Sequence, residues 1–355
     1  MSVGHPQDIP KVYLWTSSEH PYRIIPFWDI RLVQERPEDV CVCWDYTEIT
    51  HTAEDVQWTS NGLTLDVWMY NGRPLDVQWI FVLFPILCTE EAAVHYYLYT
   101  RNNLENPTQL FLNNDNVLSG SYINFTNPTK MYVPGFMGTY ENPDSQEVKN
   151  AYLYTQDCNM ILVDTSQLLT FLNRNTGLSF DAHPIGILLA EFIDYLITKG
   201  LKLTDLELIG ISLGGQAIGI AGAAIKTAYD PSGYEYNSYP PEKRLDETDA
   251  QLVIVIHTNP QMSGYDKSCG HVDFWINNNL AVQPGCTVPE VIARGATAII
   301  TYVSCSHAYS YHVAVYAIYH PNAFPALNCT SYDEYANGLC NNNDLQYVGD
   351  QVTQS

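Results

Sequence analysis

Apolar and polar stretches alternate along the chain from about residue 92 onward, and they predict strands and helices in turn. Short apolar runs typical of buried strands occur at 131–133, 159–163, 206–209 and 252–257. Residues 184–199 repeat apolar side chains at i, i+3 and i+4 and are followed by Gly200, which predicts an amphipathic helix. Alternating strands and helices favour a mostly parallel sheet with helices on both faces. The pattern therefore predicts an α/β fold in one domain over residues 91–355.

Residues 1–90 carry weaker signals, and we treat them as an N-terminal extension of unclear structure. Alternation over 63–68 favours a strand. An apolar run at 79–87 is too short to cross a bilayer, so no transmembrane segment is expected. Two interpretations of this run remain open: a buried strand, or the apolar part of an internal signal-like segment at 69–88.

One motif indicates nucleophilic chemistry. Gly210-Ile211-Ser212-Leu213-Gly214 fits G-x-S-x-G, the nucleophile elbow of α/β-hydrolases. The apolar run 206–209 before it predicts a strand, and the small apolar residues from Gln216 to Ile225 predict a helix. A sharp turn between such elements exposes the serine hydroxyl, and flanking glycines let the two backbones pass closely. Ser212 is therefore the candidate nucleophile.

Further motifs accompany the elbow in a fixed order. They are Tyr97–Asn102, Val133–Phe136, Tyr229–Pro231, Arg244–Asp246, Ile256–Thr258, Gly270–Phe274, Gln283–Cys286 and Cys305–His307. This ordered set resembles the pancreatic-type lipase family, especially its short insect members with phospholipase A1 activity, over roughly residues 92–340. The resemblance implies an α/β-hydrolase fold that acts on lipid esters and needs no cofactor and no metal.

The resemblance also implies the partners of the nucleophile. Asp230 would be the acid and His307 the base, in the chain order Ser212, Asp230, His307 that α/β-hydrolases use. A serine hydroxyl is a poor nucleophile at neutral pH, so it needs a base within hydrogen-bond reach and a carboxylate that orients the base. His257 and His271 also lie in family motifs, where they are structural.

The oxyanion hole would be formed by the backbone N–H groups of Leu213 and Phe136, by the same resemblance. The chain departs from the family pattern around this site. Pro134 stands where the family has the histidine of HGF, Ile211 stands where many relatives have histidine, and Thr165 stands where tryptophan is common. Proline removes only its own N–H, so the Phe136 donor remains. None of these departures removes a catalytic group.

Nine cysteines and two N-glycosylation sequons, at 124–126 and 328–330, favour an oxidising, extracellular location. The resemblance implies the disulfides Cys286–Cys305 and Cys329–Cys340. The first encloses residues 287–304, where the family has its lid, and an apolar stripe there suits contact with lipid. The alternative for this segment is a surface helix that covers the core. The remaining cysteines have no assigned partner: Cys41, Cys43, Cys88, Cys158 and Cys269.

Charge narrows the range of partners. The chain has 39 acidic and 16 basic residues and a net charge of −23. Because phosphate backbones require a basic surface, a nucleic-acid partner is not expected. Anionic membranes should repel the chain, so only transient contact with a lipid surface is expected. No zinc-binding pattern, phosphate-binding glycine loop or dinucleotide motif occurs in the sequence.

Two functions follow as hypotheses. The first is a secreted serine ester hydrolase acting on lipid esters, as a phospholipase A1 or a lipase. The alternative is a catalytically weak or inactive lipase-fold protein that stores or binds lipid, such as a yolk protein. The loop between Thr258 and Gly270 holds 11 residues, several of them polar. Triglyceride lipases of the family carry a longer apolar loop there, so the resemblance favours phospholipid as substrate.

Overall fold

The computed structural model describes residues 94–175, 180–260, 262–278, 280, 282–293, 299–349 and 352, together with four short strands nearer the N-terminus. The chain divides into two units, Met1–Glu90 and Glu91–Ser355. In the first unit, β1 (Val12–Leu14) pairs with β2 (Arg23–Ile25), and β3 (Val56–Ser60) pairs with β4 (Leu63–Val67), both antiparallel. The apolar run at 79–87 and the cysteines at 41, 43 and 88 lie outside the described residues.

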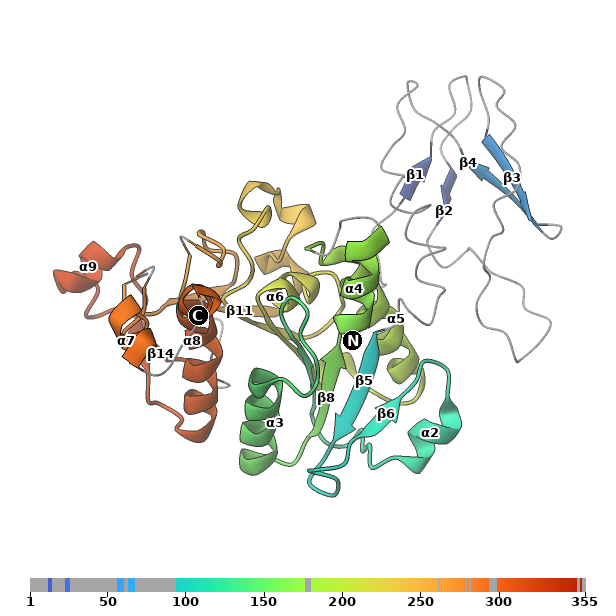
Figure 1. Ribbon diagram of the computed structural model, residues 1–355, viewed down its shortest axis with the longest axis horizontal. Helices are drawn as coiled ribbons and strands as arrows, with labels where there is room; N and C mark the ends of the chain where they lie inside the picture. Colours follow the sequence, from blue (N-terminus) through green and yellow to red (C-terminus); the bar gives the residue numbers. More distant parts are fainter. Residues whose placement is uncertain are drawn as a thin grey trace, which may run out of the picture. The chain divides into compact units, whose positions relative to one another are not determined.

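An eight-stranded sheet lies at the centre of the second unit (Figure 1). Its strands are β5 (His95–Tyr99), β6 (Thr108–Leu110), β7 (Thr129–Val133), β8 (Asn159–Asp164), β9 (Leu206–Ile211), β10 (Ile225–Tyr229), β11 (Leu252–His257) and β12 (Val272–Trp275). They lie in the order β12-β11-β10-β9-β7-β8-β5-β6. Every neighbouring pair from β12 to β8 is parallel, and β5 is antiparallel to both β8 and β6. The predicted α/β class and mostly parallel sheet are confirmed.

The helices of this unit are α2 (Asp115–Gly120), α3 (Pro143–Thr155), α4 (Ser166–Asn175), α5 (His183–Thr198), α6 (Leu213–Ala217), α7 (Val288–Ala293), α8 (Ile299–Tyr319) and α9 (Tyr332–Ala336). Short 3₁₀ turns lie at Leu203–Asp205, Tyr236–Ser238, Pro241–Lys243 and Glu247–Asp249. A small antiparallel pair, β13 (Pro325–Leu327) with β14 (Leu345–Tyr347), follows α8. None of the described helices has both the length and the hydrophobicity needed to cross a bilayer.

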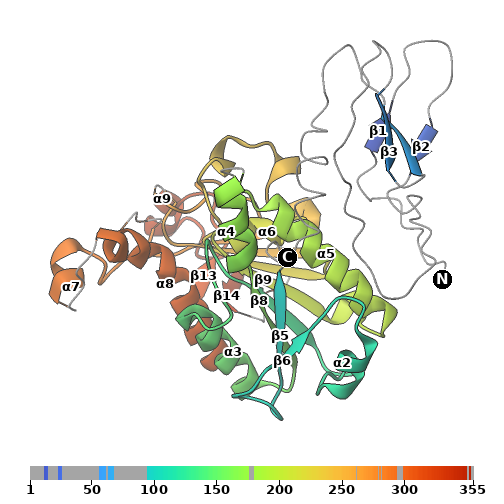
Figure 2. The same ribbon diagram turned by 45° about the vertical axis from the view of Figure 1, so that its right-hand side comes forward.

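Alternation along β5 shows that the sheet is covered on both faces (Figure 2). Tyr96 stacks on Phe192 of α5, with ring centroids 3.7 Å apart. The next residue, Tyr97, points to the opposite face and packs against the core that α3 and α8 cover. The core on that face includes Tyr132, Val148, Tyr152, Met160, Leu162, Ile209, Tyr229, Ile254, Ile256, Tyr311, Ala314 and Ile318. The layers predicted from the sequence are therefore present.

Most predicted elements have their expected bounds. The four apolar runs lie in β7, β8, β9 and β11, and the helix expected at 184–199 is α5. The helix expected from Gln216 to Ile225 was wrong, because α6 ends at Ala217 and Ile225 already begins β10. Only 18 positions separate Ser212 from Asp230, and β10 must lie between β9 and β11 within that span. The span therefore has room for little more than one helical turn.

Candidate active site

The proposed catalytic groups gather at one edge of the sheet. Parallel neighbouring strands end at the same edge, and α/β proteins bind their ligands there. Ser212 follows β9, Asp230 follows β10, and the oxyanion loop that begins at Pro134 follows β7. Strands that are neighbours in the sheet thus bring together residues that lie far apart in the sequence.

Ser212 occupies a strained turn between β9 and α6. Its backbone has φ 57° and ψ −118°, a conformation that L-residues seldom adopt and that is frequent at functional sites. Two backbone hydrogen bonds hold it there: Ser212 N donates to Tyr229 O (3.1 Å), and Ser232 N donates to Ser212 O (2.9 Å). A Cβ on Gly210 would lie 2.5 Å from the carbonyl carbon of Gly214. Gly210 is therefore required by backbone contact across the turn.

The oxyanion loop passes directly beside this turn. A Cβ on Gly135 would lie 3.1 Å from Ser212 Cβ, and a Cβ on Gly214 would lie 2.5 Å from Pro134 O. Gly138 N donates to Gly135 O at 3.0 Å, which closes a tight turn. The fixed φ of Pro134 is thus compatible with a loop that packs against Ser212.

Asp230 and His307 are joined by a short hydrogen bond. His307 Nδ1 lies 2.5 Å from Asp230 Oδ2, and the Asp230 side chain is fully buried. The other carboxylate oxygen, Oδ1, accepts the backbone N–H groups of Thr258 (2.8 Å) and Asn259 (3.0 Å). Hydrogen bonds from backbone N–H groups stabilise the ionised form of a buried carboxylate. Asp230, the proposed acid, is therefore held by hydrogen bonds to both of its carboxylate oxygens.

His307 lies on α8, two residues after Cys305. Its Nε2 atom is buried and makes no hydrogen bond within the described part of the chain. The hydrogen bond expected between His307 and Ser212 is accordingly not formed. Such contacts are often long before substrate binds and tighten in the reacting complex.

Both expected disulfides are present. Cys286–Cys305 and Cys329–Cys340 each have a Cα–Cα distance of 5.6 Å, which is normal for a disulfide. Cys286–Cys305 attaches the segment containing α7 to α8 close to His307. Cys158 and Cys269 stay outside both bonds and are buried.

Comparison with known proteins agrees with the family resemblance of the ordered motifs. The family model described as Lipase matches residues 85–354. The chain belongs to the lipase family. "Lipase member H" of Oryctolagus cuniculus is 33% identical over 71% of this chain and 55% of its own length. "Phospholipase A1 member A" of Rattus norvegicus is 30% identical over 64% of this chain and 49% of its own length. This lipase-family chain spans about half the length of the curated relatives it matches.

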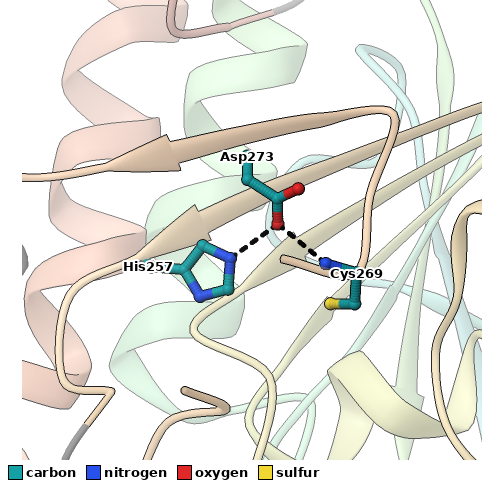
Figure 3. A group of neighbouring side chains, drawn as sticks. All are labelled: His257, Cys269 and Asp273. Atoms are coloured by element: carbon teal, nitrogen blue, oxygen red, sulfur yellow. Dashed lines mark hydrogen bonds and ion pairs between the residues drawn. The ribbon is translucent and has the colours of Figure 1, made fainter. Parts of the chain in front are cut away.

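Three side chains could be considered for a metal: His257, Cys269 and Asp273 (Figure 3). Their donor atoms lie within 4.8 Å of one another. However, Asp273 already contacts His257 Nε2 at 2.7 Å and accepts the backbone N–H groups of Cys269 and Gly270. Burial, and then the Asp273 carboxylate, raise the pKa of the Cys269 thiol, which disfavours the thiolate that a metal needs. These contacts fit a hydrogen-bonded structural cluster better than a metal site.

An exposed row of aromatic side chains lies beside the proposed oxyanion loop, and no sequence pattern indicated it. Phe136 stacks on Phe180 with centroids 4.4 Å apart, and Phe180 contacts Tyr234 at 5.0 Å. Their exposed fractions are 42%, 42% and 58%. Phe136 lies next to Gly135, and Tyr234 follows Asp230 by four residues, so both ends of the row are close in sequence to the proposed site. The three residues come from separate segments, so no periodic pattern could have revealed them.

Proposed function

We propose that this lipase-family protein is a secreted serine ester hydrolase that acts on lipid esters by an acyl-enzyme mechanism. The observation that carries the proposal is the short contact between His307 and buried Asp230, at the sheet edge where Ser212 occupies a strained turn. The two disulfides support an oxidising, extracellular location.

In this mechanism His307 Nε2 takes the proton of Ser212 while the serine oxygen attacks the ester carbonyl. Asp230 keeps the Nδ1 proton of His307 in place, so that Nε2 is the acceptor. The backbone N–H groups of Leu213 and Phe136 donate hydrogen bonds to the carbonyl oxygen and stabilise the negative charge that develops on it. His307 then returns the proton to the leaving alcohol, and water hydrolyses the acyl-serine by the same steps.

The substrate class that we favour is zwitterionic phospholipid, cleaved at its sn-1 ester. The loop after β11 is short, and its residues Thr258 and Asn259 hold Asp230 instead of extending as an apolar wall. A relative named for phospholipase A1 is consistent with this choice. The exposed aromatic row offers an apolar contact for the acyl chain, since aromatic side chains provide a large hydrophobic surface.

Hydrolysis of a short-chain p-nitrophenyl ester tests the mechanism. Ser212→Ala should lower kcat by at least about 10³-fold, as removal of a catalytic group does. A fluorophosphonate probe should label the wild type and leave the variant unlabelled. Equal activity of the two proteins would refute the enzyme mechanism, and inactivity of both would favour the lipid-binding or storage alternative.

Fatty-acid release from phosphatidylcholine and from triolein tests the substrate. We expect faster release from phosphatidylcholine, and slower hydrolysis of anionic vesicles at low salt because of the net charge of −23. Added salt should relieve that difference. Faster turnover of triolein would overturn the phospholipid assignment and leave the Ser212 mechanism intact.

A further inference from the structure

Two stretches of one loop, 258–259 and 264–265, lie on either side of the Asp230 carboxylate. At its beginning, the backbone N–H groups of Thr258 and Asn259 both donate to Asp230 Oδ1. At its end, Gly264 lies against the same carboxylate: a Cβ on Gly264 would be 2.6 Å from Asp230 Cγ and from Oδ2. One short segment therefore surrounds the acid from two sides, which requires its two ends to be close together.

The segment after Asp230 holds the far end of the loop. Tyr265 N donates to Pro231 O at 2.7 Å, and Gly233 N donates to Ser263 O at 2.8 Å. Ser232 and Gly264 form an isolated antiparallel bridge. These bonds set the distance between the loop and the carboxylate, so a side chain larger than hydrogen at Gly264 has no space.

His257 spans the two ends of the loop. Its ring is fully buried, Nδ1 lies 3.2 Å from Tyr265 O, and Nε2 lies 2.7 Å from Asp273 Oδ1. The Tyr265 carbonyl and the Asp273 carboxylate are both hydrogen-bond acceptors, so each ring nitrogen of His257 faces an acceptor. The ring also stacks on Trp275 of β12, with centroids 3.8 Å apart, and Figure 3 shows the side toward Asp273. The ring thus has one contact across the loop and a second contact to the edge strand.

We propose that His257 is a positioning residue that closes the loop around Asp230, and that Gly264 is the glycine that closure requires. The inference rests on the proposed function, because it assigns Asp230 the role of the acid. The contact that matters is Nδ1 to Tyr265 O, since it connects the end of the loop to its beginning. The contact from Nε2 to Asp273 connects β11 to β12 and supports the fold.

Two substitutions separate these contacts. In His257→Asn, the side-chain amide can occupy the place of Nδ1 and reach Tyr265 O, while the contact with Asp273 is lost. In His257→Gln, the amide reaches toward Asp273, while the contact with Tyr265 is lost. We expect His257→Gln to lower kcat about 10- to 100-fold with KM within about twofold, as misplacement of a catalytic group does. His257→Asn should retain more of kcat, even at a lower Tm.

The opposite order, with His257→Gln active and His257→Asn inactive, would overturn the proposal. It would mean that the contact with Asp273, and not the contact with Tyr265, supports activity. A loss of activity that follows the loss of Tm equally in both variants would also overturn it, because that is the behaviour of a purely structural residue.

Gly264→Ala tests the closure independently. We expect a loss of at least about 10²-fold in kcat, because displacement of the acid by about 1 Å misplaces the imidazole. Gly222→Ala is the matched control, since a Cβ there would meet nothing within 4 Å, and it should keep wild-type kcat. Wild-type kcat in Gly264→Ala would contradict the proposal.

The proton between His307 and Asp230 gives a readout that does not depend on turnover. A hydrogen bond of 2.5 Å should give a proton resonance far downfield in the NMR spectrum of the wild type. It should be lost or shifted upfield in His257→Gln and in Gly264→Ala, and retained in Gly222→Ala. An unchanged resonance in the first two variants would overturn the inference even if the wild type hydrolysed no ester, an outcome that would count against the proposed function alone.

Discussion

The two halves of the candidate site are built differently. The surroundings of Asp230 are closed to solvent and fully hydrogen-bonded. The carboxylate is fully buried, both of its oxygens accept hydrogen bonds, and there is no room for a Cβ on the neighbouring Gly264. Around Ser212 the arrangement is less complete: the buried His307 Nε2 has no hydrogen-bond partner in the described part of the chain, and aromatic side chains beside the proposed oxyanion loop face solvent. The difference fits the proposed chemistry, in which Asp230 only orients His307 while Ser212 and the oxyanion donors must contact a substrate.

The largest effect is expected from a change in the closed half. Asp230→Asn keeps an oxygen that can accept the N–H groups of Thr258 and Asn259, so the fold should persist. Its amide N–H faces His307 Nδ1 and reverses the tautomer, which should lower kcat by about 10⁴-fold. Ester hydrolysis measured beside the Tm of the variant checks this. A loss below about tenfold would mean that the closed half does not serve the reaction.

A smaller effect is expected from steric crowding in the half around Ser212. In Gly135→Ala the new Cβ would lie 3.1 Å from Ser212 Cβ, a distance that a shift of a few tenths of an ångström relieves. We expect kcat to fall about tenfold, since modest misplacement of the oxyanion donor weakens its contribution. Comparison with Gly264→Ala on the same ester is the decisive measurement. If Gly135→Ala is the more damaging of the two, the half around Ser212 is the more rigid one.

The aromatic row should affect substrate choice more than chemistry. Phe180→Ser removes the central ring of the row and with it part of the apolar surface proposed to contact the acyl chain. We expect kcat/KM for long-chain esters to fall about fivefold, equivalent to about 1 kcal/mol, and kcat/KM for short-chain esters to stay unchanged. Phe111→Ser is the control, because Phe111 is similarly exposed but follows β6 at the far edge of the sheet. Equal losses on both chain lengths would place the ring outside the acyl site.

The smallest effect on activity is expected from Asp249, a half-buried carboxyl group in the turn before β11. Burial raises the pKa of Asp249 from its ordinary value of 3.8 to about 6. The folded state therefore favours protonated Asp249. The stability that this preference contributes to folding is lost as pH rises through about 6. Asp249→Asn mimics the protonated form, so its Tm relative to the wild type should increase between pH 4 and pH 7. Ester hydrolysis should be unchanged, and a Tm difference that is constant with pH would contradict the argument.

Local sequence patterns were sufficient for much of the fold. Continuous apolar runs identified β7, β8, β9 and β11, because these strands are buried on both faces. Helical periodicity identified α5. The elbow at Ser212 was recognisable because its motif is local, and a Cβ on its first glycine, Gly210, would meet the backbone of Gly214 only four residues later. The family resemblance indicated both disulfides, and the structure confirmed them.

What the tertiary structure decided depends on contacts between distant segments. The short α6 follows from the need to place β10 between two other strands, which outweighs the helical tendency of residues 216–225. The loop around Asp230, with Gly264 and His257 at its ends, and the row that joins Phe180 to Phe136 both bring together segments with no common period. Sequence by itself determined which elements form and which groups carry the candidate chemistry. Only packing decided how the acid is held, because the hydrogen bonds and close approaches that hold it come from residues about 30 positions further along the chain.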